Sequence, residues 1–349
     1  MKRVIFTTVQ DNLEARKMLE LALKSFYTFN SGFDFKVYCL DNSKDKFKEY
    51  FDKFNFENLE FINFKDWTKW NNYLEHLEKD ELTDLERKNM YVSDPELYAF
   101  DTSVCISKLE IIDLLLEKYD LVIATDIDVV FISELAFIDE FIESGYFVGA
   151  FNELHFRTKT LNCGFCLFNK NANYIPEIFD KAIYTLKNED IRNNEHFVKT
   201  VKNTTYVFKF FEQSLLEYLV EDFYELNSYI INTCLLVDSF FEYFYKHFDN
   251  ACIIHFSGKH YKPFTEKTSN NFLNKVLFYP LKTIYWLLFK MFDVDMKLNI
   301  STGEKFSKDQ LERMSFFFSK RINEKFSKSS HCSKKFLKAT PHLKAFVKS

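Results

Sequence analysis

A short apolar run that ends in two carboxylates is the feature that most constrains the fold of this chain. Residues 121–124 are Leu-Val-Ile-Ala, and Asp126 and Asp128 follow them with Ile127 between. A run of this length and composition is typical of a strand that is buried on both faces of an α/β sheet. Residues two apart on an extended chain project to the same side, about 6 to 7 Å apart. The sequence therefore predicts a central strand with two convergent carboxylates at its carboxyl end, where open α/β sheets bind their ligands.

Asp126 and Asp128 interrupt a hydrophobic segment, because the apolar pattern resumes at residues 129–131 with Val-Val-Phe. Burying two like charges costs free energy unless a cation neutralises them, and carboxylate oxygens suit hard ions such as Mg²⁺ and Mn²⁺. The alternative interpretation is a pair of solvated turn residues that close a core strand. We favour the metal site, because no turn-forming residue flanks the pair.

Composition indicates a soluble globular protein, built as one large domain or as one domain with an appendage. The chain has 349 residues, of which 47% are hydrophobic, which is enough for a sizeable core. Its seven cysteines are scattered from Cys39 to Cys332, which fits a reducing cytosol better than a disulfide framework. Neither a signal peptide nor a stretch of about 18 uncharged apolar residues is evident, so we expect a cytoplasmic protein.

Charge is unevenly distributed along the chain. The formal net charge is −5, yet residues 272–349 alone carry 16 basic and 6 acidic side chains. The remaining body is acidic, which argues against nucleic acid as the main ligand of the part that carries the carboxylates.

The first 40 residues follow the order of a nucleotide-binding α/β sheet. Arg3–Val9 reads as a strand, residues 11–12 offer a helix cap, and a helix of period 3.6 ends near residues 30–32. A second strand is predicted at residues 35–40. This segment lacks a glycine-rich phosphate loop, so a bound diphosphate would be held by a cation and side chains.

Further strands and helices are predicted on both sides of the carboxylates. Residues 59–64 read as a third strand, and the polar stretch from about 65 to 100 reads as an insertion. Residues 103–118 have helical spacing, and Lys108 lies beside the apolar stripe of that helix, either solvated or facing a phosphate. After the carboxylates, we expect a helix over residues 132–144 and a strand over residues 146–151.

Two later strands carry polar residues that suit a binding site. Asn162 and Gly164 lie at the entrance of the strand Leu161–Asn169, and a glycine inside a strand usually marks the close approach of a ligand or another backbone. A second strand, residues 251–255, ends in His255. That imidazole is either a core side chain or part of an anion and metal site, and the glycine and lysines that follow it favour the site.

The pairs Cys163–Cys166 and Cys252–His255 have the residue types and spacing of zinc ligands. Both pairs lie on strand-like runs, where a spacing of three residues directs the two side chains to opposite faces. We therefore interpret these cysteines as core residues.

Four landmarks in a fixed order resemble the GT-A glycosyltransferases, in particular the retaining family-8-like enzymes that include bacterial lipooligosaccharide galactosyltransferases and glycogenin. They are Asp126-Ile-Asp128 for the DxD motif, Asn162-Cys-Gly164 for Asn-x-Gly, Glu212-Gln213 for Asp-Gln, and His255-Phe-Ser-Gly258 with Lys262-Pro263-Phe264 for the closing signature. The resemblance covers about residues 1–265. It implies a GT-A catalytic domain with a Rossmann-like mixed sheet over residues 1–265, followed by a basic, aromatic-rich helical region over residues 266–349.

The resemblance also implies roles for individual residues. Ligands of Mn²⁺ (or Mg²⁺) would be Asp126, Asp128 and His255. Donor-binding residues would be Thr7, Thr8, Asp11, Lys108, Asp126, Gly164, Gly258, Lys259 and Lys262. Catalytic residues along the transferred sugar would be Asn162, Glu212 and Gln213. Two departures weaken this assignment, because Glu212 replaces the family's aspartate and Lys262 lies one residue further from Gly258 than the family spacing, which makes Lys259 the alternative phosphate ligand.

The resemblance implies a metal-dependent glycosyltransferase that transfers a hexose from a nucleotide sugar, with a UDP-sugar as the expected donor, to a surface glycan or lipid-linked acceptor with retention. Two alternatives stay open. One is a phosphatase resembling the haloacid dehalogenases, which also place Asp-x-Asp after an apolar strand. The other is a non-catalytic protein that binds sugar nucleotides.

The C-terminal region begins with an apolar, aromatic stretch over residues 272–292 that contains three lysines and a proline. Such a segment suits the interface of a membrane, and the basic residues beyond it suit an anionic bilayer surface. We therefore expect a peripheral location on the cytoplasmic face of a membrane. The alternative is that residues 272–292 pack on the catalytic domain as core.

Overall fold

The computed structural model divides the chain into two compact units. Unit 1 comprises Met1–Asp11, Phe33–Asp126 and Ile138–Leu226, and unit 2 comprises Asn12–Gly32, Ile127–Phe137 and Asn227–Ser349. The structure describes residues 1–64, 107–152, 161–172, 174–188, 198–201, 204–207, 212–220, 222–233, 247–257, 284–285, 288–296, 320 and 324.

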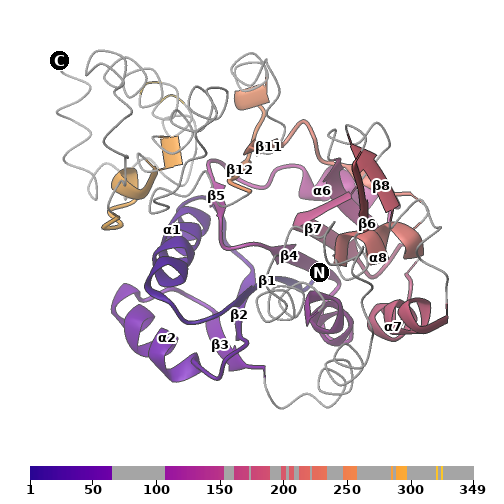
Figure 1. Ribbon diagram of the computed structural model, residues 1–349. Helices are drawn as coiled ribbons and strands as arrows, with labels where there is room; N and C mark the ends of the chain where they lie inside the picture. Colours follow the sequence, from indigo (N-terminus) through magenta and orange to yellow (C-terminus); the bar gives the residue numbers. More distant parts are fainter. Residues whose placement is uncertain are drawn as a thin grey trace. The chain divides into compact units, whose positions relative to one another are not determined.

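Unit 1 is built on a seven-stranded mixed sheet in the order β10-β6-β7-β4-β1-β2-β3 (Figure 1). Its strands are β1 (Arg3–Val9), β2 (Asp34–Cys39), β3 (Leu59–Asn63), β4 (Leu121–Thr125), β6 (Val148–Asn152), β7 (Leu161–Asn169) and β10 (Tyr224–Glu225). Strand β1 pairs in parallel with β2 and β4, and β7 runs antiparallel to both β4 and β6. The strand that precedes the carboxylates, β4, is therefore central, and all five of its residues are buried.

Helices cover this sheet because its strands are apolar on both faces. One core cluster joins Val4 and Phe6 of β1 and Val122 of β4 to residues of the helix over 107–116, of α7 (Ile178–Asn188) and of α8 (Glu212–Leu219). At the β3 edge, α2 (Lys44–Phe51) packs through stacked rings, with Phe47 and Phe51 against Phe61 at centroid distances of 6.0 and 5.5 Å. Unit 1 also contains α6 (Ile138–Glu143) and an antiparallel pair, β8 (Val198–Val201) and β9 (Thr204–Val207).

Unit 2 contains α1 (Leu13–Phe29) and a three-stranded sheet in the order β11-β12-β5. The strands are β5 (Val129–Phe131), β11 (Ile230–Asn232) and β12 (Ile253–His255), and β12 runs antiparallel to β5. Asn12 caps α1 by accepting a hydrogen bond from the backbone N of Ala15 at 2.7 Å. The helix is fixed to β5 because the backbone N of Phe131 donates to Ser25 Oγ at 3.1 Å.

Most predicted elements are observed at or near their predicted bounds, and one prediction is wrong. Residues 132–137 do not form the start of a helix, and α6 begins only at Ile138. The backbone N of Ile132 donates to the carbonyl of Cys252 at 2.8 Å, and that of Leu135 donates to Asn30 Oδ1 at 3.0 Å. These tertiary hydrogen bonds hold the segment in a non-helical conformation that local spacing does not reveal. The predicted insertion at 65–100 lies outside the described residues.

The apolar side chains in the described part of the C-terminal region are buried. Ile284, Tyr285, Leu288 and Phe289 each have exposed fractions of 1% or less. The carbonyl of Asp293 accepts a hydrogen bond from Lys24 Nζ of α1 at 2.8 Å. For these residues the packing alternative is favoured over a membrane interface. Among the helices that the structure describes, none is long and apolar enough to cross a membrane.

Candidate metal centre

Asp126 and Asp128 lie on either side of a turn rather than on one extended strand. Strand β4 ends at Thr125, residues 127–128 form a turn, and β5 begins at Val129. The assumption of an extended chain is therefore wrong here. The backbone N of Asp126 donates to the carbonyl of Gly164 in β7 at 2.8 Å, so the end of the central strand is held to its neighbour.

The register of the three-stranded sheet places His255 near the carboxylates. Antiparallel pairing of β12 with β5 places His255 opposite Val129, and the backbone N of Phe256 donates to the carbonyl of Asp128 at 2.9 Å. The His255 side chain is 2% exposed, and its Nε2 lies 3.3 Å from Asp128 Oδ1. The hydrogen-bond ladder between β12 and β5 therefore holds an imidazole beside Asp128.

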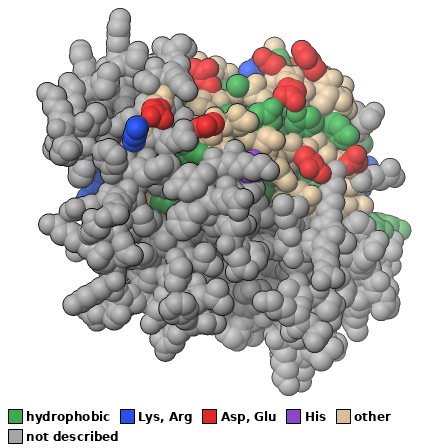
Figure 2. Space-filling view, turned by 90° about the horizontal axis from the view of Figure 1, so that it is seen from above, with side chains coloured by type: hydrophobic (Ala, Val, Ile, Leu, Met, Phe, Trp, Pro, Cys, Tyr) green, Lys and Arg blue, Asp and Glu red, His purple; other side chains and the backbone are tan. Residues whose placement is uncertain are grey.

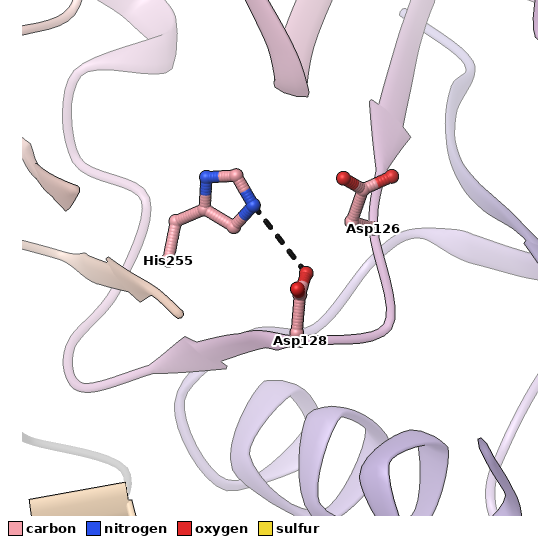
Figure 3. Close-up of side chains that lie close together, drawn as sticks. All are labelled: Asp126, Asp128 and His255. Carbon is pink, nitrogen blue, oxygen red and sulfur yellow. Dashed lines mark ion pairs between the residues drawn. The ribbon is translucent and has the colours of Figure 1, made fainter. Parts of the chain in front are cut away.

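Asp126, Asp128 and His255 each offer one ligand atom, and these three atoms lie within 4.8 Å of one another. Figure 3 shows the three side chains converging on one region from the end of β4, the turn after it and the end of β12. The three predicted metal ligands are thus brought together.

The donor set fits a divalent cation. Two carboxylates and a buried imidazole supply oxygen and nitrogen ligands of the kind that Mn²⁺ accepts, and two negative charges would otherwise lie close together. Such a cation would be held by Asp126, Asp128 and His255.

Lys108 lies against the first of these carboxylates. It sits on the helix over residues 107–116, is 3% exposed, and its Nζ forms a short ion pair with Asp126 Oδ1. This position excludes the solvated interpretation of Lys108. The predicted contact with a donor phosphate stays a prediction, because the ammonium is here engaged with a candidate metal ligand.

Asn162 and Gly164, both in β7, hold the backbone of Asp126 in place. The Asn162 side chain is buried, and its Oδ1 accepts a hydrogen bond from the backbone N of Gly164 at 2.8 Å. The carbonyl of Gly164 in turn accepts from the backbone N of Asp126. Two hydrogen bonds in series therefore link Asn162 through Gly164 to the backbone of Asp126 and help to position that residue. The sequence did not predict this structural role.

The predicted base and ribose contacts gather at the carboxyl ends of β1 and β2. Thr7 and Thr8 are buried, and the hydroxyl of Thr7 has no hydrogen-bond partner in the described structure. The backbone N of Asp11 donates to Asp41 Oδ2 at 2.8 Å, and the Asp11 carboxylate lies 3.3 Å from Lys46 Nζ. Asp41 and Lys46 were not predicted as site residues, although Asp41 closes the predicted second strand.

Of the remaining predicted site residues, the structure describes two and leaves three outside the described residues. Gln213 is half-buried in the first turn of α8, and Glu212 begins that helix. Gly258, Lys259 and Lys262 lie outside the described residues. The roles assigned to these five residues stay predictions.

Among the charged side chains that Figure 2 colours, acidic ones are more prominent than basic ones, and a histidine is also visible there. This distribution agrees with the acidic composition of the body of the chain.

Comparison of the sequence with protein-family models and with curated proteins gives no match. Among solved structures, mouse xyloside xylosyltransferase 1 aligns with a TM-score of 0.50 at 11% identity, over 74% of this chain and 98% of that one. The galactosyltransferase LgtC, solved with donor and acceptor sugar analogues, aligns with a TM-score of 0.49 at 14% identity, over 80% and 94%.

The bifunctional glycosyltransferase WbbM aligns with a TM-score of 0.45 at 11% identity, over 74% of this chain, which spans 46% of WbbM. At such identities a likeness concerns the fold. The match to the xylosyltransferase and the mixed seven-stranded sheet confirm the predicted fold class. The chain therefore has the fold of GT-A glycosyltransferases.

Proposed function

We propose that this protein is a glycosyltransferase that binds a nucleotide sugar through a divalent cation. The observation that carries the proposal is the convergence of Asp126, Asp128 and His255 within 4.8 Å, beyond the end of the central strand of this fold. Ligands of α/β sheets bind at that edge.

The side chains of the site suit the departure of an anionic leaving group. A bound divalent cation supplies Lewis-acid stabilisation of the leaving nucleoside diphosphate. Asp126, Asp128 and His255 would hold that cation. The Lys108 ammonium pairs with Asp126, and its proposed contact with a donor phosphate would add a positive charge on the leaving-group side. Gln213 and Asn162 are proposed to line the transferred sugar, with Gln213 at the reacting face.

The finer specificity is also proposed. We infer a UDP-hexose donor, Mn²⁺ as the cation, and retention of the anomeric configuration, because the motif order resembles that of retaining enzymes. The proposed acceptor is a surface glycan or a lipid-linked sugar. Proton NMR of the linkage formed from a UDP-α-sugar tests retention, and a β-linked product would contradict it.

A thermal-shift panel of nucleoside diphosphates and sugar nucleotides, with and without Mn²⁺, tests the function. A ligand of the native state raises the unfolding temperature only if it binds, so UDP with Mn²⁺ should raise it more than either alone. The matched control is Asp128→Asn, which should lose the Mn²⁺-dependent part of the shift. Absence of any shift in the wild type, together with phosphatase turnover without a sugar nucleotide, would support the phosphatase alternative instead.

We also propose that the basic residues of 297–349 bring the enzyme to an anionic membrane surface, because each such charge near an anionic bilayer contributes roughly 1 kcal/mol. Vesicle flotation tests this with Lys334, Lys335, Lys338 and Lys344 changed to Gln in the full chain. Binding that is indifferent to these changes and to salt would contradict the proposal.

A further inference from the structure

Tyr285 is a fully buried aromatic residue of the C-terminal region that lies beside the candidate metal centre. Its ring stacks on Phe256 with a centroid distance of 4.0 Å and an interplanar angle of 8°. Its exposed fraction is 0%, and its hydroxyl has no hydrogen-bond partner within the described structure. Among the described residues, packing of the ring is therefore the interaction that holds this side chain in place.

The partner of this stack is directly linked to two candidate ligands. Phe256 follows His255 in the chain, and its backbone N donates to the carbonyl of Asp128 at 2.9 Å. The position of the Phe256 ring and the placement of both ligands are therefore coupled through one short backbone segment.

Tyr285 is held in turn by the segment that follows it. Phe289 lies against Tyr285 with a centroid distance of 4.9 Å. The backbone N of Val294 donates to the carbonyl of Phe289 at 2.8 Å, and the carbonyl of Asp293 accepts from Lys24 of α1. The stack is thus anchored to the same helix that is bonded to β5.

We infer that Tyr285 is a positioning residue for the metal centre, which holds His255 and Asp128 in place by stacking on Phe256. The described residues 284–285 and 288–296 are then part of the support of the candidate metal centre rather than a separable appendage. This inference rests on the proposed function in one respect, namely that Asp126, Asp128 and His255 bind a divalent cation.

Titration of the full-length protein with Mn²⁺, followed by the electron paramagnetic resonance signal of the free ion, tests the inference without any substrate. Tyr285→Met replaces the ring with a flexible side chain that fills space, and it should weaken Mn²⁺ affinity by roughly 10- to 100-fold, as loss of an outer-shell support does. Tyr285→Phe keeps the stack and should change the affinity by less than about twofold, because the hydroxyl bonds to nothing that the structure describes.

Two further variants keep the test decisive. Phe47→Met removes a fully buried stacked ring of unit 1, so it controls for a general loss of packing and should leave Mn²⁺ affinity unchanged. Phe256→Met removes the same stack from the other side, and combining it with Tyr285→Met should add little, because the two rings act as one unit. If Tyr285→Met does not fold, Phe256→Met carries the test.

The outcomes separate this inference from the proposed function. Wild-type Mn²⁺ binding that Tyr285→Met and Phe256→Met leave unchanged would overturn the inference alone. Equal weakening by Phe47→Met would also overturn it, because the effect would then be general. A wild-type protein that binds no Mn²⁺ would overturn the metal centre and this inference together.

Discussion

The two carboxylates of the candidate centre are two residues apart, yet they have different electrostatic partners. The Asp126 side chain is 36% exposed and pairs with the ammonium of Lys108, whose side chain is 4% exposed. The Asp128 side chain is 13% exposed and faces the imidazole of His255, which is 2% exposed. Asp126 therefore has a cationic side chain as its counter-charge, whereas Asp128 is paired with a group that serves as a metal ligand in its neutral form.

This difference suggests that the two sides of the site have different roles, one in charge compensation and the other in cation binding. The Lys108 side of the site compensates the charge of Asp126 before any cation is present, and a cation must share that carboxylate with the ammonium. The His255 side presents a carboxylate and an imidazole to the same ion. Substitutions on the two sides should therefore differ in their effects on stability and on cation affinity, even where they remove activity equally.

The largest expected effect is loss of glycosyl transfer in both Asp126→Asn and Asp128→Asn. Each variant removes a ligand charge, and turnover should fall by roughly three orders of magnitude, which corresponds to about 4 kcal/mol of transition-state stabilisation. Initial rates with a sugar nucleotide and Mn²⁺ measure it. Near wild-type turnover in either variant would remove that residue from the metal centre.

The same two variants should differ in conformational stability. Asp126→Asn removes the carboxylate that compensates the Lys108 ammonium, whose side chain is 4% exposed, and should lower the free energy of unfolding by about 2 kcal/mol. The loss is smaller than for a fully buried pair because solvent reaches the Asp126 side chain. Asp128→Asn should cost less, because its partner can be neutral. Urea denaturation without metal measures the free energy of unfolding of both variants. Equal losses would contradict the proposed difference between the two sides of the site.

Removing the two partners should change cation affinity in opposite directions. Lys108→Met abolishes a positive charge that competes for Asp126 and should tighten Mn²⁺ binding by about tenfold, or roughly 1.4 kcal/mol. His255→Ala removes a ligand and should weaken binding. Calorimetric titration with Mn²⁺ measures both. Weaker binding by Lys108→Met would show that the ammonium orders the site instead of competing with the ion.

The smallest expected effect concerns the support of Asp126 from β7. Asn162→Ala removes the acceptor for the backbone N of Gly164 and should cost about 1 kcal/mol of stability, with a further loss of activity because Gly164 positions Asp126. Asn169→Ala is the matched control, since Asn169 is buried at the other end of β7 and accepts from the backbone N of Asn171 at 3.1 Å. It should lose similar stability but keep its specific activity. Equal activity in the two variants would limit Asn162 to a structural role.

Much of the sheet could be predicted from local pattern. The run before Asp126 forms the central strand β4, and the bounds of β1 and β7 agree with prediction, because a strand buried on both faces leaves a continuous apolar run in the sequence. Residues 132–137 could not be predicted, because hydrogen bonds to Cys252 and Asn30, distant in sequence, override the helical spacing.

The candidate ligands Asp126, Asp128 and His255 are predictable from residue type, position after apolar runs and motif order. Their partners are not predictable in this way and are known only from the three-dimensional structure. The ion pair of Lys108 with Asp126, the hydrogen bond from the backbone N of Asp126 to Gly164 and the stack of Tyr285 on Phe256 join residues 18, 38 and 29 positions apart. Secondary-structure propensity depends on residues that are close in sequence. The partner of a buried charge or ring depends instead on how distant segments pack against one another, which the pattern of a single segment does not contain.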